Sequence, residues 1–173
     1  MAFDFQFRFA EDRQEVDRLA RFLLLQPFNY QGYEDWVQKT REELFSGYKR
    51  CILAFSDGVL VGDLVYQPHK QFPRVREVKN MGIDPRLHGR YFGAFMLRQA
   101  ERENPGDFYA MICDARSDRR DVIGILRMMG YQELLRVPLY DKGVEDLVFI
   151  RAFERTPEGI FAPIKRDLLA RAA

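Results

Sequence analysis

The first part of the chain changes from one hydrophobic pattern to another. Between residues 3 and 9, phenylalanine occupies every second position, and this period of two predicts a half-buried β-strand. Residues 11–25 then place valine, leucine and alanine at i, i+3, i+4 and i+7, the spacing of an amphipathic helix that Pro27 ends. A second helix is expected at 34–46, closed by Gly47.

The middle of the chain predicts a hairpin. Two apolar runs flank Ser56, Asp57 and Gly58, and an Asp-Gly pair tolerates the positive φ of a tight turn. Asp118 is the expected cap of a helix that Gly130 ends. The later elements are predicted from the same strand and helix periodicities. They are a strand at 75–83, a helix at 91–104, a strand at 108–114, a helix between 118 and 130, strands near 131–139 and 145–152, and a short helix from about 163.

These elements follow one another in the order β-α-α-β-β-β-α-β-α-β-β, a mixed α/β fold. The 173-residue chain has no repeat or linker, so we expect a single domain, 1–173, with the tail of about 154–173 at its periphery. No apolar run approaches the ~18 residues of a membrane span. The N-terminus also lacks the basic and then apolar build of a signal peptide. A cytoplasmic protein without a membrane partner is therefore expected.

Charge and metal-binding residue types narrow the function classes. The net charge of +1 provides no global field that attracts nucleic acid, so that partner is not expected. Cys51 and Cys113 lie far apart, and His69 and His88 are the only histidines, which leaves too few ligands for a zinc site. We therefore expect no metal and two free thiols.

The stretch RLHGRYFGAFML, residues 86–97, joins the strand at 75–83 to an apolar helix. The first amides of a helix have no internal partner and carry the positive end of its dipole, so an anion there gains about 0.3–2 kcal/mol. Gly89 lets the backbone approach a ligand. Gly93, in the first helical turn, costs about 1 kcal/mol against alanine and so needs a reason. Taken by itself, the stretch fits a phosphate site and an ordinary helix start equally well.

The longer stretch MGIDPRLHGRYFGAFMLRQAE resembles the acetyl-CoA signature of the GNAT superfamily of N-acetyltransferases. In that family, a strand ending in apolar-x-Pro leads into Arg/Gln-x-x-Gly-x-Gly/Ala and a helix. His88 stands where Arg or Gln is usual, Tyr91 stands where the first glycine is usual, and Gly93 matches the last position. LRMMGY resembles the family's Tyr-x-x-x-Gly-Phe, with Leu126 in place of the tyrosine. The order of elements from about residue 3 to 152 also matches the family.

The resemblance implies a single GNAT-like domain with a mixed, mostly antiparallel central sheet and helices on both faces. It implies that loop amides hold the pyrophosphate of acetyl-CoA, the co-substrate, with Arg86, Arg90 and Arg98 as candidate phosphate contacts. The strand before the loop would separate from its neighbour, and helices 11–25 and 34–46 would line the acceptor-binding site. The implied cofactor-binding residues are Met81, Gly82, Ile83, His88, Gly89, Arg90, Tyr91, Phe92, Gly93 and Ala94.

Acetyl transfer to an amine needs a proton acceptor, a donor to the oxyanion and a way to reprotonate the thiolate. The Met81 amide is the candidate oxyanion donor, and Gly82 beside it fits a bulge, a close approach or a plain strand glycine. Glu77, on the same strand face as Met81, is one candidate base. Asp114, at the end of its strand, is the other. Each carboxylate alternatively forms a structural ion pair with a neighbouring basic residue.

The candidate general acid follows from a departure from the family pattern. Leu126 replaces the family's frequent tyrosine and transfers no proton. Tyr140 is the candidate substitute, whereas Tyr131 is expected in the core. A thiol with a pKa near 8.5 can also leave without an assigned acid.

The sequence therefore predicts an acyl-CoA-dependent N-acetyltransferase that acts on a primary amine of a small molecule or a protein, with a homodimer as a possible assembly. The alternative is a CoA-binding or inactive module of the same fold that acts through a protein or nucleic-acid partner. The departures at His88, Tyr91 and Leu126 favour that alternative.

Overall fold

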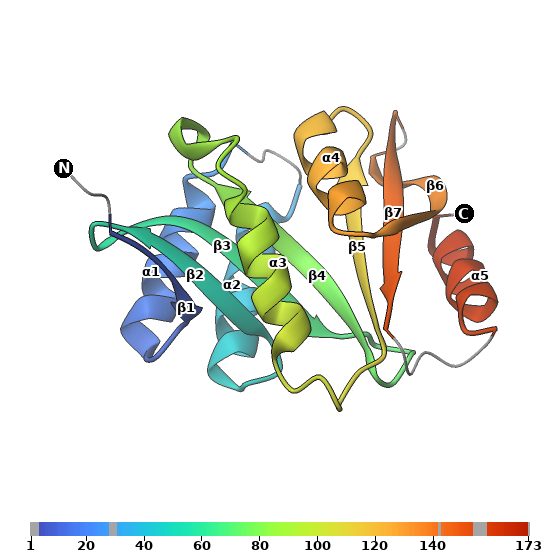
Figure 1. Ribbon diagram of the computed structural model, residues 1–173, viewed down its shortest axis with the longest axis horizontal. Coiled ribbons are helices and arrows are strands. Elements are labelled where there is room, and N and C mark those ends of the chain that lie inside the picture. The colour runs from blue at the N-terminus through green and yellow to red at the C-terminus, as the bar shows by residue number, and fades with distance from the viewer. Residues whose placement is uncertain (1–3, 28–30, 142, 154–158, 173) are drawn as a thin grey trace. The chain divides into compact units, whose positions relative to one another are not determined.

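The computed structural model describes residues 4–27, 31–141, 143–153 and 159–172, which form a mixed α/β fold (Figure 1). The predicted order of strands and helices is confirmed, and the expected helix follows the last strand. In chain order the elements are β1 (Phe5–Phe9), α1 (Arg13–Leu24), α2 (Tyr33–Phe45), β2 (Arg50–Ser56), β3 (Val59–Pro68), β4 (Val75–Ile83), the 3-10 turn η1 (Pro85–Leu87), α3 (Phe92–Arg102), β5 (Ala110–Arg116), α4 (Arg120–Met128), β6 (Gln132–Asp141), β7 (Val144–Ala152) and α5 (Phe161–Ala172).

Two compact units make up the chain. The first contains the residues up to Gln67 together with Lys79–Ala100, and the second contains Pro68–Val78 and the residues from Glu101 on. Strand β4 contributes to both, because its first residues belong to the second unit and its last residues to the first. Hydrogen-bonded neighbours follow the order β1-β2-β3-β4 in the first unit and β4-β5-β7-β6 in the second.

Helices cover both faces of the sheet in the first unit, as predicted (Figure 1). α1 and α2 pack on one face through apolar side chains that meet those of β2 and β3. α3 lies on the other face, where the ring centroid of Phe92 is 4.9 Å from those of Phe5 and Phe7. The core residues under α1 and α2 are Leu19, Ala20, Leu23, Tyr33, Val37, Cys51, Leu53, Phe55, Leu60 and Val65.

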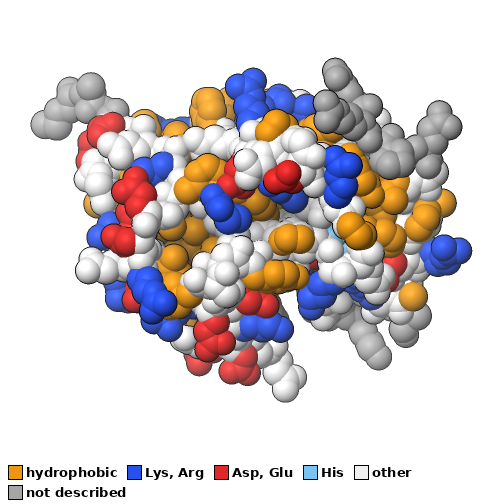
Figure 2. Space-filling view, turned by 90° about the horizontal axis from the view of Figure 1, so that it is seen from below, with side chains coloured by type: hydrophobic (Ala, Val, Ile, Leu, Met, Phe, Trp, Pro, Cys, Tyr) orange, Lys and Arg blue, Asp and Glu red, His pale blue; other side chains and the backbone are white. Residues whose placement is uncertain are grey.

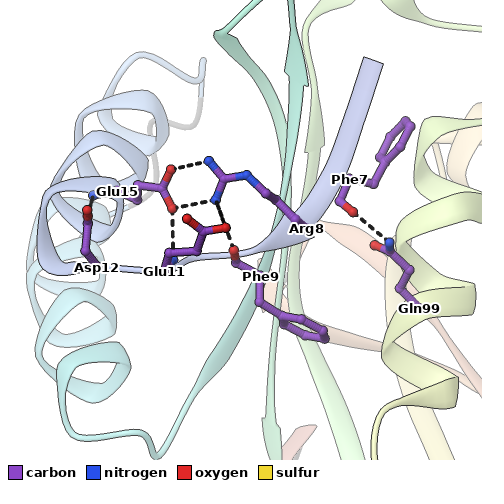
Figure 3. A network of polar contacts seen from close by, with 7 residues as sticks. All are labelled: Phe7, Arg8, Phe9, Glu11, Asp12, Glu15 and Gln99. Carbon is purple, nitrogen blue, oxygen red and sulfur yellow. Dashed lines mark hydrogen bonds and ion pairs between the residues drawn. The ribbon is translucent and has the colours of Figure 1, made fainter. Parts of the chain in front are cut away.

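Polar contacts fix the start of α1 (Figure 3). The Glu15 amide donates to Asp12 Oδ1 at 2.9 Å, so Asp12 caps the helix. The Glu15 carboxylate accepts hydrogen bonds from both terminal nitrogens of Arg8 on β1. Figure 3 also shows Gln99 of α3 donating to the Phe7 carbonyl, at 2.8 Å. β1 is therefore held to one helix on each side of the sheet.

The predicted hairpin between β2 and β3 is confirmed. Asp57 and Gly58 have φ values of 49° and 77°, the left-handed conformation that an Asp-Gly pair accepts in a two-residue turn. The strands pair antiparallel, and Leu53 lies opposite Asp63. Directly opposite residues point to the same side of a sheet, so Asp63 faces the core beneath α1 and α2.

The sheet of the second unit has one parallel and two antiparallel pairings. β5 pairs in parallel with β4 from Val75 opposite Ala110 to Glu77 opposite Ile112. β7 pairs antiparallel with both β5 and β6. Together with the antiparallel pairs of the first unit, this makes the sheet mostly antiparallel, as predicted.

Helix α5 corrects one prediction. The tail from about residue 154 was expected at the periphery, but Ile164 and Leu168 of α5 are buried in the core of the second unit. They contact a cluster of side chains from β5, β6 and β7.

The Asp118 side chain, just before α4, also differs from expectation. Asp118 does not cap α4, because its carboxylate accepts a hydrogen bond from Arg116 at 2.9 Å, and Arg119 holds the cap position without a side-chain bond. Phe95, an apolar residue of α3, is 56% exposed, although its ring contacts that of Phe7.

A charged network is buried in the second unit. Arg151 Nη1 donates to Glu101 Oε1 and Oε2 at 2.9 and 3.0 Å and to the Met129 carbonyl at 2.7 Å. The Tyr131 hydroxyl donates to Glu101 Oε1 at 3.1 Å. Tyr131 is thus a core residue, as predicted, and Glu101 is the acceptor on which the network depends.

A second buried charge lies in the first unit. Asp63 is 0% exposed, and its Oδ2 accepts a hydrogen bond from Asn80 Nδ2 at 2.8 Å. Burial raises the pKa of Asp63 to about 7, and among the described residues only the Asn80 amide opposes this rise. Burial, followed by the Asp63 charge, also raises the pKa of the Cys51 thiol to about 12. Both cysteines are free and buried.

Side chains of both charge signs are mixed over the face shown in Figure 2, in keeping with the net charge of +1. No helix within the described ranges has the length and apolar character needed to cross a membrane.

Replacement of Glu101 by alanine is expected to lower the free energy of unfolding by about 3–5 kcal/mol, because Arg151 loses its carboxylate partner in the interior. Chemical denaturation measures the change. Glu133→Ala is the matched control, since Glu133 pairs with Arg127 and Arg136 at the surface, where such pairs contribute about 0–1 kcal/mol. Equal small losses in both variants would show that the network does not stabilise the fold.

Asp63→Asn is expected to change the pH dependence of stability. The unfolded chain releases this proton near pH 4, whereas the folded chain holds it to about pH 7, so stability falls as pH rises through this window. Asparagine does not titrate, and the variant should be more stable than the wild type at about pH 8 by on the order of 4 kcal/mol. At about pH 4 the difference should be small. Unfolding free energies across this range measure the effect, and parallel profiles would contradict it.

Candidate functional site

The turn after β4 is held in shape by Asp84. Its carboxylate accepts two hydrogen bonds from the Arg86 guanidinium, at 3.0 and 2.7 Å, and one from the Arg86 amide at 2.9 Å. These bonds hold the pKa of Asp84 at about 2. The Asp84 amide donates to the Val61 carbonyl of β3 at 2.8 Å, which anchors the turn to the sheet. Arg86, a candidate phosphate contact, is therefore an exposed side chain engaged by Asp84.

The loop between η1 and α3 has an unusual backbone. Gly89 has a φ of 78°, and Tyr91, which is not a glycine, has a φ of 59°. Left-handed φ values cost L-residues roughly 1–2 kcal/mol, so Tyr91 is held in this conformation by its surroundings. Its side chain is 57% exposed, which is compatible with a ligand contact made by the amide rather than the side chain.

Several amides of this loop are available for an anion. α3 begins at Phe92, so the amides of its first turn have no intrahelical acceptor. No described residue accepts a hydrogen bond from the amides of Gly89, Tyr91, Phe92, Gly93 or Ala94. The side chains of Phe92 and Ala94 are buried, which leaves only their backbone for a ligand.

His88 contacts the end of β4. Its Nε2 lies 3.1 Å from the Ile83 carbonyl, a contact in which the ring nitrogen donates. The contact ties the loop to the end of β4. Arg90 is exposed, with its guanidinium carbon 5.9 Å from the centre of the Phe5 ring.

The strand residues predicted to contact the cofactor lie at the end of β4. Met81 and Ile83 are partly buried, and Gly82 is buried. A Cβ at Gly82 would lie 2.7 Å from Asp63 Oδ1, so of the three interpretations of Gly82, the close approach is the one observed. Among the described residues, no β4 residue after Glu77 pairs with β5, so pairing ends before the part of β4 that was expected to offer backbone groups to the cofactor.

The three predicted catalytic side chains come together in the second unit. Glu77 lies on β4, Asp114 on β5 and Tyr140 on β6. The Tyr140 hydroxyl donates a hydrogen bond to the Asp114 carboxylate, and the negative charge of Glu77 acts on the same hydroxyl. Nothing in the spacing of these residues along the sequence predicted their proximity.

The pKa of Tyr140 lies above the usual tyrosine range. Desolvation of the hydroxyl, the charges of Asp114 and Glu77 and the hydrogen bond to Asp114 all raise it. The residue as a whole is 66% exposed, so water moderates the desolvation, and the two carboxylates are sufficient to set the direction. Tyr140 therefore stays protonated at neutral pH and can donate a hydrogen bond to an anion.

Two basic residues that are close to these carboxylates in the sequence also bind other groups. Arg76 donates to the Glu103 carbonyl at 2.8 Å and lies 3.8 Å from its carboxylate. Arg116 pairs with Asp118 at 2.9 Å. Leu126, at the position of the family's tyrosine, is 0% exposed and is part of the hydrophobic core.

Asp63 and its partner Asn80 were not among the predicted site residues. A signal was present, because Asp63 is the one charged residue in the apolar run of β3, where a lone carboxylate is costly to bury. In the part of the chain that the structure describes, no group of three or more His, Cys, Asp or Glu side chains is arranged to hold a metal ion.

Comparison with solved structures identifies the fold. The chain is similar to yncA from Salmonella typhimurium, solved with its cofactor acetyl-CoA, with a TM-score of 0.70, 13% identity and coverage of 90% of this chain and 99% of that one. A GNAT-family acetyltransferase from Streptococcus pneumoniae gives a TM-score of 0.69 at 13% identity, with coverage of 87% and 99%.

RimL, the ribosomal L7/L12 alpha-N-protein acetyltransferase in complex with coenzyme A, gives a TM-score of 0.67 at 15% identity, with coverage of 88% and 96%. No protein-family model matches the sequence, and no curated protein matches it either. The likeness is therefore one of backbone structure over nearly the whole chain. The protein has the fold of the GNAT acetyltransferases.

Proposed function

We propose that the protein is an acyl-CoA-dependent N-acetyltransferase that transfers the acetyl group of acetyl-CoA to a primary amine. The observation that carries the proposal is the set of loop amides at Gly89 and Tyr91–Ala94 that no described residue engages, at the start of α3. The same turn lies in a fold whose solved examples include proteins with acetyl-CoA or coenzyme A bound.

The loop suits a diphosphate for physical reasons. Amides at a helix N-terminus point outward with the positive end of the helix dipole, and hydrogen bonds from such donors to a charged group contribute about 1.5–3 kcal/mol each. Gly89 has no heavy atom within 4 Å of the place where a Cβ would stand, so a ligand can reach its backbone. In this proposal, residues Met81–Ile83 and His88–Ala94 form the cofactor-binding segments, with His88 acting through its contact with Ile83.

The side chains of Glu77, Asp114 and Tyr140 can accept and donate the two protons that the reaction transfers. The attacking amine must lose a proton, and the thiolate of coenzyme A must gain one. Asp114, with Glu77 as the alternative, would accept the first proton. Neutralising Asp114 removes a charge that raises the pKa of Tyr140, so the hydroxyl becomes a better donor when the thiolate leaves. The Met81 amide is the proposed donor to the oxyanion.

The alternative function is a CoA-binding module without turnover. Its support is Leu126, a buried leucine at the position of the family's tyrosine. The proximity of Tyr140 to Asp114 favours the enzyme instead, because it supplies a protonated hydroxyl beside a carboxylate. Binding of coenzyme A without thiol release across a broad panel of primary amines would support the module.

Gly89→Glu is expected to abolish the stabilisation of the protein by coenzyme A, because the new carboxylate faces the diphosphate. In the wild type, ligand at 100 times its dissociation constant should add about 2.7 kcal/mol to stability, which a thermal-shift assay detects. Gly58→Glu is the matched control, since Gly58 has a φ of 77° and the same open surroundings on the hairpin. A full shift in Gly89→Glu would place the cofactor elsewhere.

Tyr140→Phe and Asp114→Asn are each expected to lower kcat by about 10²–10⁴, the usual contribution of acid–base catalysis, while the coenzyme A thermal shift remains. Thiol release from acetyl-CoA measures kcat with an amine that the panel identifies. If the two residues act as a unit, the double variant should lose little more than either single variant. Tyr48→Phe, at an exposed position of the first unit, is the control. If kcat of the double variant falls by the product of the two single losses, the two residues act independently and the proposed coupling is wrong.

A further inference from the structure

Three polar side-chain ends surround Gly82. A Cβ at this glycine would lie 2.7 Å from Asp63 Oδ1, 3.4 Å from Asn80 Nδ2 and 3.8 Å from Gln26 Nε2. These residues come from β3, β4 and the segment after α1, and all belong to the first unit. The direction in which a side chain would leave Gly82 is therefore lined by groups that can form hydrogen bonds.

Asp63 is incompletely satisfied at this point. Its Oδ2 accepts from Asn80 at 2.8 Å, whereas Oδ1 has no hydrogen-bond partner among the described residues, although the residue is 0% exposed. A buried carboxylate oxygen without a donor is costly, and a charged donor that reaches it gains more than a neutral one. The fold thus contains an acceptor that lacks a donor.

The chemistry of the site selects its ligand. A carboxylate repels anions and attracts cations that carry N–H groups. One carboxylate with two amides offers too few hard ligands for a divalent ion, which prefers six or more oxygens. The Gln26 amide can present either nitrogen or oxygen, because its orientation is assigned from hydrogen bonding, whereas the Asn80 nitrogen already donates to Asp63 Oδ2. An ammonium group, with three donors, can therefore bind Asp63 and an amide oxygen together.

The route to Asp63 limits the size of the ligand. Asn80 and Gln26 are each partly exposed, so the buried carboxylate lies next to two side chains that reach the surface. Gly82 adds no side chain between them, and an added Cβ would contact Asp63 Oδ1 too closely. A slender chain ending in a primary amine fits this approach better than a branched or quaternary one.

We propose that Asp63 Oδ1, approached beside Gly82 between Asn80 and Gln26, binds the amino group of the acceptor, and that the acceptor is a primary amine on an unbranched chain. The proposal rests on the proposed acetyltransferase function and specifies the substrate class of that reaction. Asp63 faces the side of the sheet covered by α1 and α2, the side that the sequence resemblance assigned to the acceptor.

The electrostatics of Asp63 agree with this role. Burial raises its pKa to about 7, so a bound cation in place of the missing donor has a large effect on its ionisation. The nearby Cys51 thiol, with a pKa raised to about 12, stays neutral and provides no counter-charge.

The test follows the Asp63 carboxyl directly. The full chain, labelled with ¹³C at aspartate, is titrated with n-butylammonium, and the Asp63 resonance is assigned by its loss in Asp63→Asn. Bound ammonium should move this resonance and lower the pKa of Asp63 by about 1–3 pH units, the effect of a close opposite charge. Butanol, which has the same chain without the charge, should do neither. Asp57→Asn, on the hairpin turn, is the variant control and should leave the Asp63 response unchanged.

Two results would overturn the proposal. An Asp63 resonance and pKa that do not respond to saturating n-butylammonium would mean that the free oxygen holds water or nothing. An equal response to butanol would mean that the site does not recognise charge. The coenzyme A thermal shift, measured on the same samples, separates this failure from failure of the proposed function, because Asp63→Asn should leave that shift intact.

Discussion

The close approach of β3 and β4 is the constraint on which the candidate site depends. A Cβ at Gly62 would lie 2.9 Å from the Gly82 carbonyl and 2.7 Å from Ile83 Cδ1, so no side chain fits there. The Asp84 amide then donates to the Val61 carbonyl at 2.8 Å, which holds the chain to β3 at the residue that follows β4. The turn η1 and the loop after it therefore start from a fixed point on the sheet. Amides that bind an anion must be preorganised, and this anchoring supplies that condition.

The same approach explains why the first unit contains an unfavourable group. Asp63 Oδ1 lies against the backbone of Gly82, where a larger residue at either position would separate the strands or displace the carboxylate. Burying an ionised carboxylate with one amide partner lowers stability at neutral pH, so Asp63 contributes nothing to folding that a neutral residue would not. Destabilising polar groups of this kind concentrate at functional sites, and β3 places this one beside β4.

The order of elements and most buried faces could be predicted because they depend on local periodicity. Asp57 and Gly58 predicted their turn from their own conformational preferences. The cluster of Glu77, Asp114 and Tyr140 could be predicted as a set of candidates but not as neighbours, because three separate strands bring them together. Asp118 failed as a cap because a competing cation, Arg116, lies two residues away.

The departures from the family signature at Tyr91 and His88 are compatible with the backbone conformation of the loop. Tyr91 stands where glycine is usual, yet it adopts a φ of 59°, close to the conformation that glycine would provide, and its side chain is exposed. His88 holds the loop through the Ile83 carbonyl in place of a charged side chain. A site built from main-chain amides tolerates such substitutions provided that φ, the helix start and the anchor to β3 are kept. This accounts for a chain that no family model matches by sequence while its backbone follows the GNAT fold over nearly its whole length. It also means that the functional side chains to examine are those that the backbone brings together, Asp114 with Tyr140 and Asp63 with Asn80, rather than those that the signature names.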